Sequence, residues 1–443
     1  MLGNRRWGAV SGMLLLHVSD IHFRHPICNT NRDPDRPFRT RLIQDARDRV
    51  KSLGSVDAIL VGGDIAFAGK PQEYVAALKW LYELADACGC ARNRIFVIPG
   101  NHDVDRDVIR ADLSVQNAQR AIVNAASADD KEWQIERQLQ HAETGPALLR
   151  PIAAYNDFAF NFSGNIFAPE RLSWKADLPF RDGITLRIHG LNSTILSGWR
   201  TPEGQNDVER DLYVEPQQTA LDPVDDVVNL VMCHHPPDWL TDGDRVADDV
   251  TSRCTVHLFG HKHRQRIVRD PRYVTFYAGA VNPERQAKDW RPGYNMIDLS
   301  LGRNKTGQPQ LEVAAHLLEW QTSPEGFKAI KDDDCEIHHA EVRLRNVNPR
   351  PSAAVVGPAS PVAEPPSDGV EAVMSDDRAR SIVLRFWQLD MSDRREISRT
   401  LKLNDPAEAG LPPSERFGRV LIRAGQKNLL EELDREIAKR ERR

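Results

Sequence analysis

Five short apolar runs in this chain each end at a segment that carries potential metal ligands. The runs are rich in β-branched and aliphatic residues, which is typical of buried strands. They span residues 13–18, 56–61, 94–98, 227–232 and 254–259. The segments that follow are Ser-Asp-Ile-His, Gly-Gly-Asp-Ile, Gly-Asn-His-Asp, Cys-His-His-Pro-Pro and Gly-His-Lys-His. Because open α/β sheets gather ligands beyond the carboxyl ends of their strands, we expect these segments to meet.

Helical patterns separate the first three apolar runs. Residues 38–50 and residues 73–88 both have apolar side chains at the spacing of one helix face. The alternation of strands and helices predicts a layered α/β domain. Later apolar runs at 293–299, 311–320 and 336–344 predict strands that close this domain.

The rest of the chain predicts an insertion, a linker and a second module. Residues 103–162 are polar and helical in pattern, and we interpret this long connection as a cap beside the site. Residues 346–374 are rich in proline and predict a linker. Residues 375–443 are again helical, with predicted N-caps at Ser375, Ser392 and Ser414. The first twelve residues are interpreted as a leader, with Met13 as a candidate start.

Composition narrows the classes of function. A length of 443 residues with 40% hydrophobic residues predicts two or three domains. The net charge of -5 argues against a globally basic nucleic-acid surface, although it allows a local basic patch. The six cysteines lack disulfide or zinc spacing, so we expect free thiols and a cytoplasmic location. No stretch approaches the roughly 18 apolar residues of a membrane span.

Seven residues in the five segments have side chains that suit metal binding. Each of them alone could be an ordinary turn or loop residue, and it is their joint occurrence that predicts a site. Carboxylate, amide and imidazole donors in this mixture suit manganese, iron, zinc or nickel. A two-metal site is typical of enzymes that split phosphate esters. The seven are Asp20, His22, Asp64, Asn101, His234, His261 and His263.

The five segments, in this order, resemble the motifs of the calcineurin-like metallophosphoesterases. The D-x-H, G-D, G-N-H-D, H and G-H-x-H motifs are intact, and their neighbours are similar to the bacterial phosphodiesterase branch. The resemblance implies an α/β (α+β layered) fold, in which a calcineurin-like β-sandwich is flanked by helices. We expect this domain at 13–345, with a helical cap insertion and a small all-α C-terminal domain.

The resemblance also implies a pair of divalent metal ions. Manganese is the first candidate, and iron, zinc and nickel are the alternatives. Asp20, His22 and His263 would hold the first metal. Asn101, His234 and His261 would hold the second, and Asp64 would bridge the two. A hydroxide shared by the metals would then attack phosphorus.

Two neighbours of Asn101 are assigned roles without binding metal. His102 would protonate the leaving group or stabilise the phosphoryl oxygens. Asp103 would accept a hydrogen bond from His102 and fix its tautomer. His235 is interpreted as a structural residue behind the ligands. Charged residues beside the site, Arg24, Arg106 and Lys262, are either substrate contacts or solvated charges.

The C-terminal residues 375–443 resemble the helical adaptor or effector-associated domains of bacterial conflict systems. The resemblance implies a protein partner that carries a similar domain. Residues 396–401 are also similar to a helix-turn-helix core, so DNA binding is the alternative, and a plain helical bundle is a third. The module is only mildly basic, which favours the protein partner.

The sequence therefore predicts a dinuclear phosphodiesterase with a C-terminal interaction module. A DNA or RNA nuclease effector of a bacterial defence system and a non-catalytic partner-binding protein are the alternatives. The substrate is expected to be a phosphate ester, with nucleotides and nucleic acids included, and no membrane partner is expected. The physiological substrate, the identity of the metal and the oligomeric state stay open.

Overall fold

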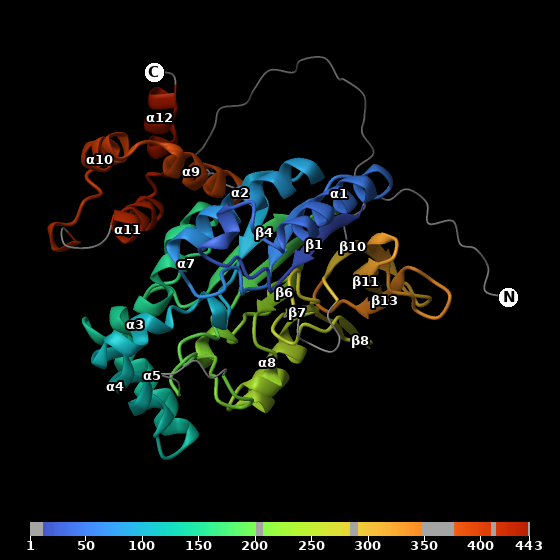
Figure 1. The fold of residues 1–443 in the computed structure, drawn as a ribbon, viewed down its shortest axis with the longest axis horizontal. Helices are drawn as coiled ribbons and strands as arrows, with labels where there is room; N and C mark the ends of the chain where they lie inside the picture. The colour runs from blue at the N-terminus through green and yellow to red at the C-terminus, as the bar shows by residue number, and fades with distance from the viewer. Residues whose placement is uncertain (1–11, 201–206, 284–290, 348–375, 409–412, 442–443) are drawn as a thin grey trace.

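Two β-sheets form a sandwich with helices on its outer faces in the computed structural model (Figure 1). The structure describes residues 12–200, 207–283, 291–347, 376–408 and 413–441. The predicted leader and nearly all of the predicted linker lie outside these residues. None of the described helices is both long and apolar enough to cross a membrane.

The first sheet contains the strands that precede three of the predicted ligand segments. Its order is β12-β11-β10-β1-β2-β3, and β13 pairs with β11. Strands β1, β2 and β3 are parallel, whereas β10 runs antiparallel to β1. The bounds are β1 (Met13–Val18), β2 (Ala58–Val61), β3 (Ile95–Val97), β10 (Gly293–Arg303), β11 (Pro309–Thr322), β12 (Glu325–Ala329) and β13 (His338–Arg343).

The second sheet contains the strands that precede the other two predicted ligand segments. Its order is β4-β5-β6-β7-β9-β8, with β5, β6, β7 and β9 parallel to one another. The bounds are β4 (Trp174–Pro179), β5 (Thr185–Gly190), β6 (Val227–Cys233), β7 (Val256–Phe259), β8 (Arg266–Asp270) and β9 (Tyr273–Tyr277). All five apolar runs are therefore strands, as predicted.

The core of the sandwich explains why these strands are apolar on both faces. In β1, Leu15 points into the cluster between the two sheets, while Leu14 and Leu16 join the cluster beneath the helices. Ala58 and Ile59 alternate in the same way in β2. A strand that is covered on both faces reads as a continuous hydrophobic run rather than an alternating one.

Helices cover the outside of the sandwich. Both helices predicted between the first strands are present, as α1 (Arg36–Leu53) and α2 (Pro71–Cys88), and α8 (Gly243–Arg253) precedes β7. The predicted cap region is helical and contains α3 (Arg106–Ala111), α4 (Leu113–Val123), α5 (Ala128–Gln140), α6 (Thr144–Leu149) and α7 (Ala153–Ala159). Short 3-10 turns are η1 (Ile27–Asn29), η2 (Arg92–Arg94), η3 (Asn101–Asp103), η4 (Arg150–Ile152), η5 (Phe160–Phe162), η6 (Pro216–Gln218), η7 (Pro237–Trp239) and η8 (Pro406–Glu408).

The C-terminal module has a small core of its own. It comprises α9 (Asp376–Gln388), α10 (Met391–Thr400), α11 (Pro413–Gln426) and α12 (Leu430–Glu441). Its centre includes Phe386 and Phe417, which are both buried. The predicted cap at Ser392 is wrong, because α10 begins one residue earlier and the Asp390 carboxylate accepts from the Asp393 amide instead. Ser375 and the Ser414 side chain lie outside the described part of the chain.

The module packs against the sandwich through a buried arginine of α9. Arg380 is only 6% exposed. Its Nε donates to the carbonyl of Asn93 at 2.8 Å, and its Nη2 donates to those of Ile95 at 2.9 Å and Phe162 at 2.5 Å. The guanidinium also lies 4.1 Å from the ring centroid of Phe96. Figure 1 shows α9 beside α2, on the side away from α3, α4 and α5.

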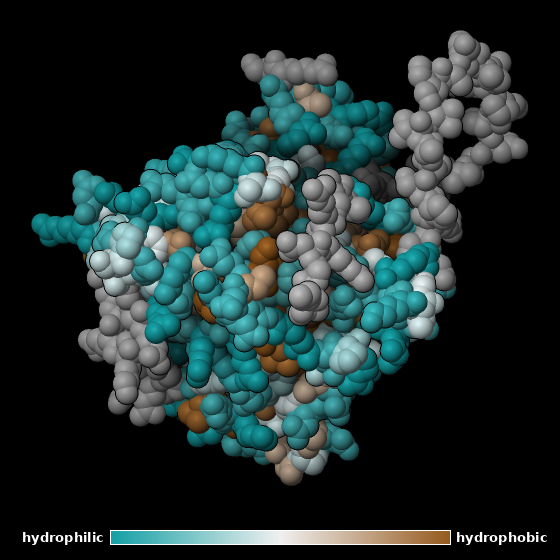
Figure 2. All heavy atoms as spheres, turned by 90° about the vertical axis from the view of Figure 1, so that its right-hand side faces the viewer, coloured by the Kyte–Doolittle hydropathy of each residue, from teal (hydrophilic) through white to brown (hydrophobic). Residues whose placement is uncertain are grey.

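The outer surface offers no broad apolar face in the view of Figure 2. Hydrophilic residues cover most of that side, and apolar residues show in small separate patches. A surface of this kind is ordinary for a protein in water.

Candidate metal centre

The loops that follow five parallel strands meet at one edge of the sandwich. Strands β1, β2 and β3 lead into the loops of Asp20, Asp64 and Asn101, and β6 and β7 lead into those of His234 and His261. The loops hydrogen-bond directly to one another. The Asp20 amide donates to Gly63 at 3.0 Å, and the Gly260 amide donates to His234 at 3.0 Å. The predicted meeting of the five segments is therefore confirmed.

The backbone at this edge is unusually strained. Five of the seven predicted ligands have φ between 52° and 67°, which is the left-handed region that side chains other than glycine rarely adopt. Such a residue costs roughly 1–3 kcal/mol, so the surrounding structure must hold it in place. Strained residues of this type gather at functional sites. The five are Asp20, His22, Asp64, His261 and His263.

Two glycines allow the loops to approach closely. A Cβ at Gly63, where φ is +93°, would lie 2.7 Å from Nδ1 of His234. A Cβ at Gly100 would lie 2.5 Å from the amide nitrogen of Asp64. Because both neighbours belong to the loops of predicted ligands, a larger residue here would displace the site.

The first group of predicted ligands surrounds the end of β1. Nε2 of His263 lies 3.1 Å from Oδ1 of Asp20. Nε2 of His22 lies 3.3 Å from Oδ2 of Asp64. Asp20, His22 and His263 each offer a donor atom, and these atoms lie within 4.8 Å of one another.

The second group surrounds the end of β3. Oδ1 of Asn101 lies 3.2 Å from Nε2 of His234 and 3.0 Å from Nδ1 of His261. Nε2 of His234 is also 3.3 Å from Oδ2 of Asp64. Asp64 therefore stands between the two groups, with one carboxylate oxygen at the same distance from a histidine of each.

Backbone carbonyls orient two of these histidines. Nδ1 of His22 contacts the Asn282 carbonyl at 3.1 Å, and Nδ1 of His234 contacts the Gly62 carbonyl at 2.8 Å. A carbonyl can only accept, so Nδ1 carries the proton in both rings. Nε2 of each ring then faces the carboxylates, and it would present a lone pair to a metal there once the ring is neutral.

The electrostatics of the cluster favour positive charge. Burial alone would raise the pKa of Asp64, but attraction to His234 and His102 and hydrogen bonds from His22 and His234 hold that pKa well below its usual range. Burial alone would lower the pKa of His234, but the Asp64 and Asp20 carboxylates raise it to about 9. Buried carboxylates, an amide oxygen and imidazoles thus form a donor set that fits divalent cations.

The predicted partner of His102 is wrong. Nδ1 of His102 donates to the Phe67 carbonyl at 2.8 Å, and Asp103 makes no hydrogen bond with this ring. Phe67 therefore sets the tautomer, and it also stacks on the ring with centroids 5.1 Å apart. Burial lowers the pKa of His102 to about 4.

Asp103 instead holds the loop that carries Asp64. Its carboxylate accepts from the amides of Ala66 at 2.9 Å and Gly100 at 2.9 Å, and from the Tyr74 hydroxyl at 2.8 Å. Burial and the charge of Asp64 raise the pKa of Asp103 to about 6. Asp103 directly follows His102 in the 3-10 turn η3, so the two neighbouring side chains point in different directions, and that of Asp103 is buried.

His235 lies against the second group of ligands. Its Nε2 is 3.1 Å from Oδ1 of Asn101, and its Nδ1 is 2.8 Å from the Ser193 hydroxyl. Burial, followed by the neighbouring His261 and His234, holds the pKa of His235 well below its usual range. A neutral His235 can orient the Asn101 amide, and its structural role stays a prediction.

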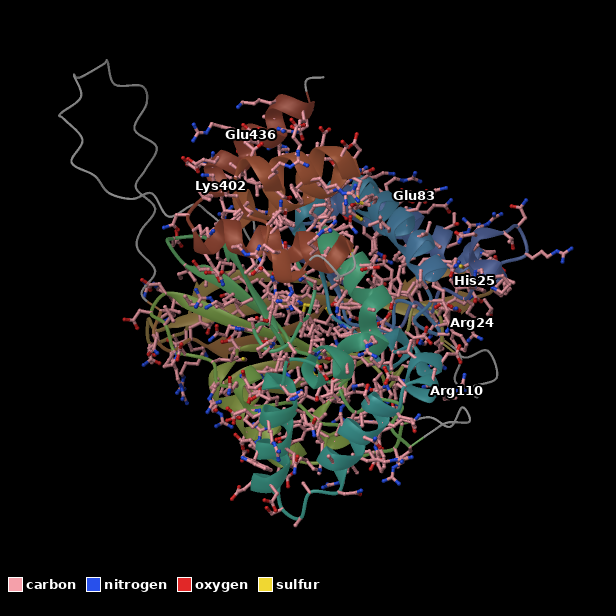
Figure 3. The ribbon with its side chains drawn as sticks, turned by 90° about the vertical axis from the view of Figure 1, so that its left-hand side faces the viewer. Arg24, His25, Glu83, Arg110, Lys402 and Glu436 are labelled. Atoms are coloured by element: carbon pink, nitrogen blue, oxygen red, sulfur yellow. The ribbon has the colours of Figure 1, made fainter. Side chains whose placement is uncertain are left out.

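A cavity of about 470 Å³ opens beside the metal centre. Asn101, His102, Phe67 and Arg106 line it. Arg24 lies over the Phe67 ring at 3.7 Å from its centroid. Figure 3 shows Arg24 and Arg110 on one side of the molecule, away from Lys402 and Glu436 of the C-terminal module.

The sequence indicated no role for Phe67, and it favoured solvated charge over a substrate contact for Arg24 and Lys262. Phe67 sits three residues after Asp64, and its position in the loop is the only signal that the sequence offers for it. Lys262 pairs with Asp238 and lines a different cavity. Its charge is therefore matched within the protein.

The two-sheet fold and the cluster of carboxylate, amide and imidazole donors suit a protein that binds divalent metals. Residues 13–265, more than half of the chain, match the family model described as calcineurin-like phosphoesterase. The chain belongs to the calcineurin-like phosphoesterase family, whose members use divalent metals. The predicted family and fold class are confirmed.

Residues 378–439 match the family model described as GTPase-associated adaptor domain. The predicted resemblance of the C-terminal module to an adaptor is thus confirmed.

One curated relative is the glycerophosphodiester phosphodiesterase GpdQ of Enterobacter lignolyticus. It is 34% identical over 95 residues, which are 20% of this chain and 30% of the relative. The match thus spans less than a third of the relative's length.

Solved structures with related folds include Vps29 of Chaetomium thermophilum and GAP50, the anchor in the inner membrane complex of Plasmodium. Vps29 is 11% identical with a TM-score of 0.30, covering 75% of this chain and 100% of the other. GAP50 is 10% identical with a TM-score of 0.34, covering 76% and 91%.

Proposed function

We propose that the protein is a dinuclear phosphodiesterase whose activity is directed by its C-terminal adaptor. The single observation that carries this proposal is the position of Asp64. Its Oδ2 lies 3.3 Å from Nε2 of both His22 and His234, between two complete sets of donors. A carboxylate in that position suits a bridge between two cations.

The ligand assignment follows the two groups of donors. The first cation would be held by Asp20, His22 and His263, and the second by Asn101, His234 and His261. Manganese is the first candidate, because this mixed oxygen and nitrogen set accepts several ions and cells select by availability. When bound, such a pair supplies a nucleophile from water at neutral pH and neutralises charge on phosphoryl oxygens.

The chain's own residues prepare the substrate side of this centre. Phe67 holds His102 through its carbonyl and its ring, so that Nε2 of His102 faces away from the Phe67 carbonyl. In this position His102 can exchange a proton with the leaving oxygen or bind a phosphoryl oxygen. Asp103 positions the Asp64 loop without touching substrate.

The cavity beside His102 favours a small ester over a nucleic-acid strand. Its cations are matched by acids, since Lys70 pairs with Asp105 and Asp107, and Arg110 also pairs with Asp107. A groove for a nucleic-acid backbone would need unmatched positive charge along its length. The volume of about 470 Å³ falls within the range of small-molecule sites.

In this proposal the phosphoesterase domain spans residues 13–345 and includes the helical cap at 103–162. A linker at 346–374 joins it to the adaptor domain at 375–443. The adaptor match supports a protein partner, and the name of that domain family suggests a partner associated with a GTPase. Recruitment of an effector enzyme in this way, within the cytoplasm, would suit a bacterial defence system.

The proposal is tested with the full chain and bis-p-nitrophenyl phosphate in Mn²⁺. Asp64→Ala should abolish hydrolysis and reduce the bound metal from two ions per chain, as measured by elemental analysis. Hydrolysis and metal content that match the unaltered protein would exclude the dinuclear mechanism. Asp182→Ala is the control and should leave both unchanged, because Asp182 is a partly exposed aspartate with a comparable left-handed backbone in the turn between β4 and β5.

The class of substrate is identified by comparing hydrolysis rates across a panel of phosphate esters. Glycerophosphodiesters, cyclic nucleotides, single- and double-stranded DNA, RNA and phosphopeptides are compared at equal concentration. We expect the highest kcat/KM for a small diester. A higher value for DNA or RNA would make the protein a nuclease instead.

A further inference from the structure

A second cavity lies at the other end of the second sheet, far from the metal centre. It has a volume of about 510 Å³ and is lined by Val227 and Asn229 at the start of β6 and by Thr255 before β7. His234 follows the opposite end of β6. His234 lies five positions after Asn229, which corresponds to about 16 Å along an extended strand at the usual rise per residue. The two cavities are therefore separate sites.

Arginine dominates the lining of this second cavity. Arg253 ends α8, Arg272 lies in the turn between β8 and β9, and Arg343 and Arg345 come from the end of β13 and the residues after it. No aspartate or glutamate is among the residues found to line the cavity. We name this set the arginine cavity.

Two of the four arginines of the arginine cavity form ion pairs with nearby aspartates. Arg253 pairs with Asp249 at 2.9 Å, and Arg272 pairs with Asp270 at 3.1 Å. Across the described ranges, neither Arg343 nor Arg345 lies within ion-pair distance of a carboxylate. The cavity thus holds an excess of two guanidinium charges.

The backbone fixes the segments that carry these arginines. The Arg343 amide donates to the Pro271 carbonyl at 2.9 Å, and the Asp226 amide donates to the Asn346 carbonyl at 2.8 Å. Burial alternates from 341 to 345, so Arg343 and Arg345 lie on the same exposed side of the chain. Arg343 therefore ends β13, and Arg345 lies two residues beyond it in a segment that these backbone hydrogen bonds tie to its neighbours.

We propose that the arginine cavity binds a small phosphate-bearing anion through Arg343 and Arg345. The planar guanidinium donors match phosphate oxygens, often with two parallel hydrogen bonds. A ligand with at least two negative charges would neutralise the excess. The proposal concerns a site separate from the metal centre and does not rest on the proposed hydrolysis.

The surroundings favour a small ligand over a nucleic acid. The segment that lines the cavity through Leu221, Pro223 and Val224 also carries Asp222 and Asp225, which are exposed. A long phosphate backbone that entered the cavity would meet these carboxylates, whereas a compact anion would not. The net charge of -5 adds to the repulsion of a large polyanion.

Binding is measured by calorimetry on the full chain in EDTA, so that phosphate cannot bind through metals. Inorganic phosphate, pyrophosphate and ATP are the probes, and a single-stranded oligonucleotide is the competitor. We expect pyrophosphate to bind at one site and the Arg343→Ala/Arg345→Ala variant to bind it at least about tenfold more weakly. Arg303→Ala removes an exposed arginine from β10 and should leave the affinity unchanged.

Three results would overturn the proposal. They are no binding of any probe to the unaltered chain, equal affinity in the double variant, and tighter binding of the oligonucleotide through the same two arginines. Thermal melting checks that the double variant is folded. If it is not, Arg345→Gln, which lies beyond the strand end, replaces it and must weaken pyrophosphate binding at least about threefold.

Discussion

His102 shows how one side chain at the site is positioned by a residue far from it in sequence. Its Nδ1 donates to the Phe67 carbonyl, and Phe67 stacks on its ring. Nδ1 is therefore occupied, so only Nε2 can act on a substrate. The adjacent Asp103 acts on the backbone of the Asp64 loop instead.

We predict that His102→Ala lowers kcat by roughly a hundredfold or more, because that is the usual contribution of a proton-transfer group. The loss should be larger for an alkyl phosphodiester than for bis-p-nitrophenyl phosphate, since p-nitrophenolate leaves without a proton. Steady-state kinetics on both esters measure this difference. An equal loss on both would assign His102 to phosphoryl-oxygen binding rather than protonation.

Tyr74 contributes a buried hydrogen bond to the loop network around Asp103. Its hydroxyl donates to Asp103 at 2.8 Å in a buried setting, so Tyr74→Phe removes one hydrogen bond to a carboxyl group. The free energy of unfolding should fall by about 1–3 kcal/mol. Urea denaturation measures the change. Tyr273→Phe, which alters a partly buried tyrosine outside this network, serves as the comparison and should cost less.

The ends of five strands, and the glycines beside them, bring the candidate ligands together. Ligands from both sheets meet because β1, β2, β3, β6 and β7 all finish at the same edge. The glycines there leave no room for a Cβ, since the loops hydrogen-bond to one another at about 3 Å.

We therefore predict that Gly100→Ala lowers the metal content and the hydrolysis rate at least about tenfold while the chain stays folded. The added Cβ would press on the Asp64 amide and move the Asp64 carboxylate, which is the proposed bridge between the metals. Gly326→Ala is the matched control, because a Cβ there meets nothing within 4 Å. Elemental analysis and circular dichroism together separate loss of metal from loss of fold. Full metal occupancy in Gly100→Ala would contradict this account.

The whole molecule combines a sandwich that bears the site with a module docked on another side. Arg380 is the main polar anchor, because its guanidinium reaches three carbonyls from the region of β3 and η5. Phe160 and Trp387 pack beside it, with ring centroids 5.0 Å apart. A buried arginine with these partners is costly to remove.

Arg380→Ala should release the module from the sandwich, because the exposed carbonyls lose charge-assisted hydrogen bonds that contribute about 1.5–3 kcal/mol each. Limited proteolysis should then cut between the two parts faster than in the unaltered chain. Arg378→Ala is the control on the same helix, since Arg378 is exposed and pairs with Glu431 and Asp434 inside the module. Equal cleavage of the two variants would show that Arg380 does not anchor the module.

Removal of bound metal should also lower the thermal stability of the whole chain. EDTA should lower the Tm, and Mn²⁺ should restore it, because a ligand that binds only the folded state stabilises it by about 2.7 kcal/mol at a hundredfold excess over its Kd. Differential scanning fluorimetry measures the shift. The Asp64→Ala variant should show a smaller response, and an identical response would place the bound metal elsewhere.

Much of the fold could be predicted from local sequence. The five strands and helices α1 and α2 follow from apolar runs and helical spacing, with ends within a few residues of those observed. The order of strands in each sheet could not be predicted, because it depends on pairings such as that of β1 with β10, which lie far apart in the chain.

The sequence by itself predicted the family and the candidate donors. Each donor follows a strand directly, and the spacing of residues inside a motif is local information. Only the tertiary structure decided which groups face one another: Phe67 with His102, Asp103 with the Asp64 loop, Arg380 with the sandwich, and four arginines in one cavity. These contacts join residues from separate segments, and they form only when the packing of the two sheets and the helices brings those segments together.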